Sequence, residues 1–162
     1  LTVTDIGING KLNEVAAAFG LLHLEHMATA KARRADLDRR YRAALEPIEG
    51  IHCSPRPDKV EANFGYFPVL VEPPYPLSRD QLCAKLREAG IYARRYFYPL
   101  VSDFRMYSKE PSASPANLPV ARSIADKVLC LPIYADLSHD QQDRVIDQIH
   151  DGCPPSRHRR PL

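Results

Sequence analysis

Two stretches of the sequence carry residue types that suit binding of an anionic or polar ligand. The first is the turn Gly7-Ile8-Asn9-Gly10-Lys11, which precedes a long helical pattern. Unpaired backbone N–H groups at a helix start favour an anion, and the Asn9 amide and Lys11 ammonium would lie beside them. The alternatives are that Asn9 caps the helix and that Lys11 is a solvated surface lysine. The residues alone leave both interpretations open.

The second stretch is Arg94-Arg95-Tyr96-Phe97-Tyr98, which ends at Pro99. Weak alternation and aromatic content predict a strand over residues 91–98. Side chains at a strand end before a loop can reach a crevice, so Arg94, Tyr96 and Tyr98 are candidate ligand-binding residues. The alternative is that the arginines pair with nearby acids.

The sequence gives little indication of a metal site or of disulfide bonds. The six histidines are scattered, and no Cys/His or carboxylate group has the spacing of metal ligands, so we expect no metal site. The four cysteines form no CxxC pair and no regular framework, which favours reduced structural thiols over disulfides. These residues are Cys53, Cys83, Cys130 and Cys153.

The element that must position the first stretch is one long helix over residues 12–48, which stops near Pro47. About 35 residues span roughly 50 Å, more than a domain of this size needs, so such a helix usually joins two bodies. From Leu12 to Met27 it is apolar on almost every face. We therefore expect protein that this chain does not contain to cover that part.

The remaining pattern predicts a small α/β layer of three or four strands with helices on one face. Ser78 with Gln81, and Ser138 with Gln141, have the spacing of capping boxes that start helices. The predicted strands are 51–53, 63–72, 91–98 and 128–133, and the predicted helices are 78–89, 118–126 and 138–149.

Composition fits one globular domain, or one domain with part of another, in 162 residues with 44% apolar content. The formal charge of +2 falls to −1 without the three arginines of the C-terminal tail, which leaves no basic footprint for nucleic acid. No signal peptide pattern and no apolar run of about 20 residues is present, so we expect no membrane span. The chain begins Leu1-Thr2, which is compatible with a fragment, a processed product or an unusual start codon.

Several motifs resemble segments of the DegT/StrS family of pyridoxal-phosphate-dependent sugar aminotransferases. The turn above and the helix start read as the family's G-x-N-x-[RK]-[ML]-x-E-x-x-A-A segment, and residues 94–100 read as R-x-Y-F-x-P-L. Each motif alone is weak, but their order and spacing together are specific from about Asp5 to Asp151. The other matching segments are Leu118-Pro119-Val120-Ala121 and Val128-Leu129-Cys130-Leu131-Pro132-Ile133-Tyr134.

The resemblance implies the C-terminal half of a fold-type I enzyme. Residues 1–11 would end the large cofactor domain, 12–48 would be the connecting helix, 49–151 the small C-terminal domain and 152–162 a flexible tail. In the family the Schiff-base lysine lies N-terminal to the Gly-x-Asn segment, so no catalytic residue is expected in this chain.

The resemblance also assigns ligands to the candidate residues. Asn9 would donate its amide to the cofactor phosphate of the neighbouring subunit, and Lys11 would be a cation near phosphate or substrate. Arg94, Tyr96 and Tyr98 would lie near the sugar, with the tyrosines favoured.

The implied function is a cytoplasmic, homodimeric aminotransferase that acts on a dTDP-linked 4-keto-6-deoxy sugar with pyridoxal 5'-phosphate as cofactor and glutamate as donor. Within the family, enzymes that make dTDP-4-amino-4,6-dideoxyglucose are the most similar. The alternatives are a sugar 3-aminotransferase, a dehydratase branch of the same family, or an inactive truncated domain that dimerises or pairs with a separate N-terminal half.

Overall fold

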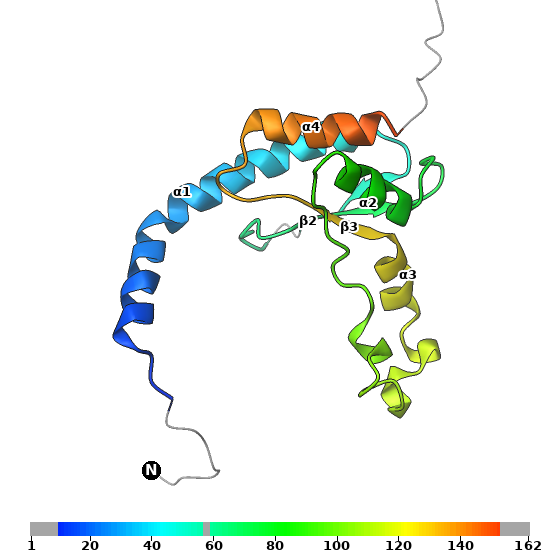
Figure 1. The fold of residues 1–162 in the computed structure, drawn as a ribbon, viewed down its shortest axis with the longest axis horizontal. Helices are drawn as coiled ribbons and strands as arrows, with labels where there is room; N and C mark the ends of the chain where they lie inside the picture. The colour runs from blue at the N-terminus through cyan, green and yellow to red at the C-terminus, as the bar shows by residue number, and fades with distance from the viewer. Residues whose placement is uncertain (1–9, 57–58, 153–162) are drawn as a thin grey trace, which may run out of the picture.

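The computed structural model describes residues 10–56 and 59–152, which form four α-helices and a three-stranded sheet (Figure 1). Three short 3₁₀ turns lie between α2 and α3, at Val101–Asp103, Pro111–Ala113 and Pro115–Asn117. The helices are α1 (Glu14–Leu45), α2 (Arg79–Glu88), α3 (Pro119–Lys127) and α4 (His139–His150), and the strands are β1 (Ile51–Cys53), β2 (Phe67–Val71) and β3 (Val128–Leu131).

Helix α1 confirms the long helix, with a different start and end. The Asn13 side chain accepts a hydrogen bond from the Ala16 N–H at 2.8 Å, so Asn13 and not Asn9 caps the helix. The helix ends at Leu45, and Pro47, which has no backbone N–H, cannot continue its hydrogen bonding. Its second half enters the core through Tyr41 and Leu45, both fully buried.

The first half of α1, which we call the apolar front (residues 12–27), projects away from the rest of the chain (Figure 1). Its large apolar side chains are exposed to between 54% and 81%, so no described part of the chain covers them. This agrees with the expectation drawn from its all-round apolar character. The exposed side chains are Leu12, Val15, Phe19, Leu21, Leu22, Leu24 and Met27.

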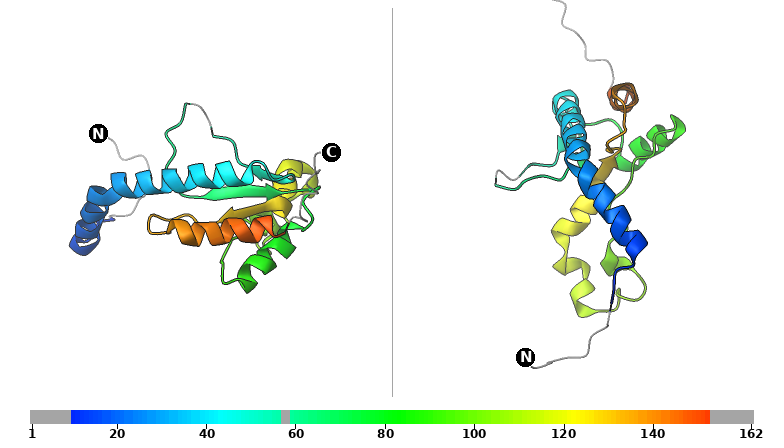
Figure 2. Two further views of the ribbon diagram at one scale, coloured as in Figure 1. Left: turned by 90° about the horizontal axis from the view of Figure 1, so that it is seen from above. Right: turned by 90° about the vertical axis from the view of Figure 1, so that its left-hand side faces the viewer.

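The sheet is antiparallel in the order β1-β2-β3. Ile51 pairs with Val71 and Phe67 pairs with Leu131, which puts these side chains on one face because alternate residues of a strand point the same way. Burial alternates along β2, as a strand with one core face requires. Helices α1, α2 and α4 cover this face, whereas the 3₁₀ turns and α3 lie toward the other side (Figure 2).

Helices α2 and α4 begin as the sequence predicts. Ser78 and Ser138 each accept a hydrogen bond from the backbone of the glutamine three residues on, and each glutamine side chain accepts one from the serine N–H. Helix α4 lies along α1 and is held there by Gln142, whose Nε2 donates to the Leu37 carbonyl at 2.7 Å. Tyr41 donates to the Pro132 carbonyl at 3.0 Å and ties α1 to the connection between β3 and α4.

The predicted strand over residues 91–98 is wrong. Within it only Arg94 pairs with the sheet, exchanging backbone hydrogen bonds of 2.9 and 2.7 Å with Cys130. The chain then turns, with the Tyr98 N–H donating to the Arg95 carbonyl at 2.8 Å. The aromatic rings that suggested a strand pack on one another: the Tyr96 ring lies 5.0 Å from Phe97 and 5.5 Å from Tyr66.

Three further predictions differ in extent or lie outside the structure. The strand expected from residue 63 begins only at Phe67, after a turn in which the Gly65 N–H donates to Asn63 at 2.9 Å. The expected end of a large domain (1–11) and the tail (152–162) lie almost entirely outside the described residues. No helix in the described ranges is long and apolar enough to cross a membrane.

Candidate functional site

The segment of residues 92–98, which we call the Tyr-Arg segment, leaves the end of α2 and crosses the outer edge of β3. The paired backbone of Arg94 and Cys130 fixes its position. The sequence therefore brings together Arg94, Tyr96 and Tyr98, as predicted, but on a turn that follows a single bridge and not on a strand.

Arg94 is exposed and has no carboxylate partner among the described residues. Its guanidinium lies 5.9 Å from the Tyr96 ring centre, which leaves its charge available to a ligand anion. The neighbouring Arg95 pairs with Asp80 at 3.1 Å, so the alternative of simple ion pairing holds for one arginine and not for the other.

The Tyr98 ring lies close to two guanidinium groups, with its centre 4.9 Å from Arg79 and 5.3 Å from Arg95. Arg79 is 3% exposed and donates to the carbonyls of Ala125 at 2.8 Å and Val128 at 3.2 Å. It therefore joins α2 to the start of β3 while supporting the Tyr98 ring. The sequence does not predict this role, because the helix-start signal that contains Arg79 does not indicate which residues its side chain contacts.

A groove of about 780 Å³ lies between α2 and the Tyr-Arg segment. Its lining carries three arginines against one acid, together with exposed aromatic rings, so it suits a polar ligand with negative charge. The charged lining residues are Asp80, Arg87, Arg94 and Arg95, and the aromatic ones are Tyr92, Tyr96, Phe97, Tyr98 and Phe104.

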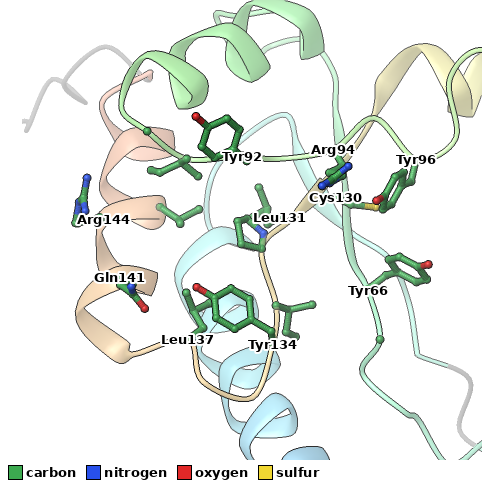
Figure 3. Close-up of a pocket in the computed structure, with 16 residues that line it drawn as sticks. Tyr66, Tyr92, Arg94, Tyr96, Cys130, Leu131, Tyr134, Leu137, Gln141 and Arg144 are labelled. Atoms are coloured by element: carbon green, nitrogen blue, oxygen red, sulfur yellow. The ribbon is translucent and has the colours of Figure 1, made fainter. Parts of the chain in front are cut away.

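A second pocket, of about 440 Å³, shares Tyr92, Arg94 and Tyr96 with the groove (Figure 3). Its floor includes Cys130, where burial raises the pKa of the thiol and a hydrogen bond from the Tyr96 backbone opposes that shift. Because the thiolate is the nucleophilic form, this cysteine is a structural residue and not a reactive one.

The two predicted cofactor residues are placed differently. Asn9 lies outside the described residues. Lys11 is exposed just before α1, at the end of the helix that projects from the body, and the structure does not bring it to the Tyr-Arg segment (Figure 1). Two other lysines are engaged in the fold: Lys85 donates to the Gln148 carbonyl at 2.8 Å, and Lys127 pairs with Glu72 at 2.7 Å.

Metal and disulfide chemistry have no site within the ranges described. Residues 10–56 and 59–152 contain no group of three His, Cys, Asp or Glu side chains that could hold a metal ion. Cys53, Cys83 and Cys130 are free thiols, and Cys153 lies outside the described residues.

Residues 1–150 match the sequence profile of the DegT/DnrJ/EryC1/StrS aminotransferase family. The chain belongs to this family. The match includes α1, the Tyr-Arg segment and β3, so the resemblance carried by the sequence motifs is confirmed.

Individual members of the DegT/DnrJ/EryC1/StrS family are similar over nearly the whole chain. A dTDP-4-amino-4,6-dideoxy-D-glucose transaminase of Escherichia coli is 46% identical over 140 residues, which are 86% of this chain and 38% of the relative. A Shigella dysenteriae transaminase of the same name is 46% identical over 146 residues, or 90% of this chain and 39% of the relative. The chain thus spans about two fifths of the length of these relatives.

The fold agrees with solved structures of the same family. The Streptomyces venezuelae protein DesV, solved in complex with a ketimine intermediate, superposes with a TM-score of 0.81 at 30% identity over 91% of this chain and 38% of DesV. TlmJ, an aminotransferase of Streptoalloteichus hindustanus, gives a TM-score of 0.78 at 27% identity over 93% of this chain and 39% of TlmJ. The described helices and sheet therefore have the fold of about two fifths of these aminotransferase chains.

Proposed function

We propose that this chain is the C-terminal part of an aminotransferase that converts a dTDP-linked 4-keto-6-deoxy sugar to the 4-amino sugar, with glutamate as amino donor. The observation that carries the proposal is the 46% identity with two dTDP-4-amino-4,6-dideoxy-D-glucose transaminases. Two relatives named dTDP-3-amino-3,4,6-trideoxy-alpha-D-glucose transaminase are only 28% and 30% identical. The difference favours amination at carbon 4 over carbon 3.

The cofactor of this reaction would be pyridoxal 5'-phosphate, which supplies the electron sink that transamination needs. Among the described residues the group that fits it is Lys11, an exposed cation one turn before the capped start of α1. Lys11 would contact the phosphate as a point charge, and Asn9 would donate its side-chain amide to the same group. The rest of the cofactor site, including the Schiff-base lysine, would come from residues outside this chain.

The groove beside the Tyr-Arg segment would bind the substrate. Arg94 has no acid partner among the residues that the structure describes, and it would hold a phosphate or a sugar hydroxyl through its N–H groups. Tyr96 and Tyr98 would present their hydroxyls to the sugar, and Arg79 and Arg95 would hold the Tyr98 ring in place. A fixed ring orientation lowers the entropic cost of binding.

The partner would be a cofactor-binding body, and two such subunits would form a cytoplasmic homodimer. A helix that is apolar on all faces is normally buried, and the apolar front of α1 is exposed here. A cofactor domain lying on the apolar front would both cover it and bring Lys11 to the cofactor phosphate.

The test is a chimera in which residues 10–150 replace the matching segment of the Escherichia coli relative. The folded chimera, incubated with glutamate and dTDP-4-keto-6-deoxyglucose, should give the amino sugar, detected by its mass. Arg94→Gln should raise KM at least about tenfold, since a charge-assisted hydrogen bond contributes roughly 1.5–3 kcal/mol. Arg105→Gln, an exposed arginine that lines neither pocket, is the matched control.

Four outcomes would contradict the proposal. A folded, dimeric chimera that aminates only the 3-keto sugar would support the 3-aminotransferase alternative, and one that only dehydrates the sugar would support the dehydratase branch. If the 162-residue chain by itself retained pyridoxal phosphate after borohydride reduction, the Schiff-base lysine would lie within it. An Arg94→Gln chimera with unchanged KM would remove Arg94 from the substrate site.

A further inference from the structure

We propose that the 440 Å³ pocket behind the Tyr-Arg segment is a binding site for a flat aromatic ring that carries a phosphate or a carboxylate. It lies between the end of α2, strand β3 and the first turns of α4 (Figure 3). The pocket shares Tyr92, Arg94 and Tyr96 with the groove proposed for the substrate, whereas Tyr134 and Arg144 line this pocket and not the groove. Its volume lies within the range of sites for small molecules, about 300–1,000 Å³.

Tyrosine side chains line the walls of the pocket, and such walls suit a planar ring. Figure 3 shows Tyr92 and Tyr134 on opposite sides of Leu131, which lies at the floor between them. The floor is apolar and buried, since Leu131, Leu137 and Val145 are at most 7% exposed. A ring that entered would therefore have aromatic side chains beside it and apolar carbon below it.

The tyrosines at the rim of the pocket are largely open to solvent. Tyr66, Tyr92 and Tyr134 are 60%, 69% and 47% exposed. Three large exposed rings around one hollow mark a binding surface more often than chance, because single exposed apolar side chains are normally scattered. A stacked ring would cover the faces that water now contacts.

The positive charge of the arginines that line the pocket favours an anionic ligand. Its lining contains Arg94 and Arg144 and no aspartate or glutamate. Neither arginine has a carboxylate partner in the described part of the chain, and Arg144 has only a long hydrogen bond of 3.3 Å to the Ala89 carbonyl. They lie at opposite ends of the pocket in Figure 3, so a phosphate or carboxylate meets a cation at either end.

Two kinds of molecule share this chemistry, nucleoside phosphates and aromatic carboxylates, and calorimetric titration of the 162-residue chain distinguishes them. Titration with dTMP and with 4-hydroxybenzoate should give saturable binding for at least one of them. The one that binds more tightly identifies which of the two kinds of molecule the pocket takes. Thymidine lacks the anion and deoxyribose 5-phosphate lacks the ring. Each should bind at least about tenfold more weakly than dTMP if the nucleotide is the ligand.

The variants Tyr134→Leu and Arg144→Gln should each weaken ligand binding at least about fivefold. For Tyr134 this is the lower limit for the loss of one stacking ring. Their matched controls are Tyr107→Leu, at a ring 49% exposed, and Arg105→Gln, both of which lie outside the pocket and should bind as the parent chain does. Circular dichroism and the thermal midpoint check that each variant is folded.

Three results would overturn the proposal. The first is that neither dTMP nor 4-hydroxybenzoate gives saturable binding up to millimolar concentration. The second is that deoxyribose 5-phosphate binds as tightly as dTMP while 4-hydroxybenzoate does not bind, which would leave an anion contact without a ring site. The third is that folded Tyr134→Leu and Arg144→Gln variants bind with the affinity of the parent.

Discussion

Replacing Val15, Phe19 and Leu22 together by glutamine separates the fold of this chain from the contacts of its apolar front. The three side chains are 81%, 64% and 54% exposed, and glutamine is as good a helix former as the residues it replaces or better. The free energy of unfolding of the isolated chain should therefore change by less than about 0.5 kcal/mol in urea titration. The far-UV circular dichroism should keep its helical signal.

The same substitutions should be costly where a second body covers α1. Fully burying such a side chain contributes about 1.5–3 kcal/mol, and half to four fifths of each is open here, so each would add roughly 1–2 kcal/mol to the contact. In the chimera with the Escherichia coli relative, the triple variant should lose at least about 3 kcal/mol of stability. Leu45→Ala, at a fully buried position, should cost about 2–5 kcal/mol in both proteins.

Either of two results would refute this reasoning. A loss above about 2 kcal/mol in the isolated triple variant would mean that the apolar front supports the fold of this chain itself. An unchanged chimera would mean that no second body lies on α1. The Leu45→Ala variant shows in each case that the urea titration detects a buried loss.

Three further substitutions test the fold and its pH dependence. Gly50 has φ +80°, and a Cβ there would lie 2.2 Å from the Glu72 carbonyl oxygen, so Gly50→Ala should lower the free energy of unfolding by more than about 2 kcal/mol. Gly90 has φ +76° but lies in open space, so Gly90→Ala should lower it by only about 1 kcal/mol. Urea midpoints measure both losses. A hydrogen bond from His139 holds the pKa of Asp36 below its usual value. The stability it supplies is therefore present above about pH 4 and is lost in more acid solution, and Asp36→Asn should remove this part of the acid loss, by less than about 1 kcal/mol at an exposed pair.

The long helix and both capping boxes could be predicted because their signals are local. Ser78 and Ser138 each have a glutamine three residues on, and this spacing is sufficient to start a helix in any surroundings. The exposure of the apolar front within this chain could also be predicted. Its pattern is apolar on almost every face, and the predicted elements offered no surface to cover it. In each case neighbouring residues decide the outcome.

The strand over residues 91–98 could not be judged locally. Aromatic residues favour strands, but a strand also needs a partner, and β3 offers one bridging pair, at Cys130, before Pro132. The reach of Arg79 to the end of α3 depends on a chain segment more than forty residues away, which no spacing within α2 could indicate. The pocket beside the Tyr-Arg segment likewise depends on how α4 packs.

The burial of Tyr41 and Leu45 makes the second half of α1 move with the sheet. The part of the helix from Leu37 back to Glu14 then acts as a lever of about 35 Å, at 1.5 Å per residue. A rotation of the sheet body by about 5° would carry the start of the helix through roughly 3 Å, the length of a hydrogen bond. Small rotations of the sheet body are thus mechanically linked to the position of Lys11.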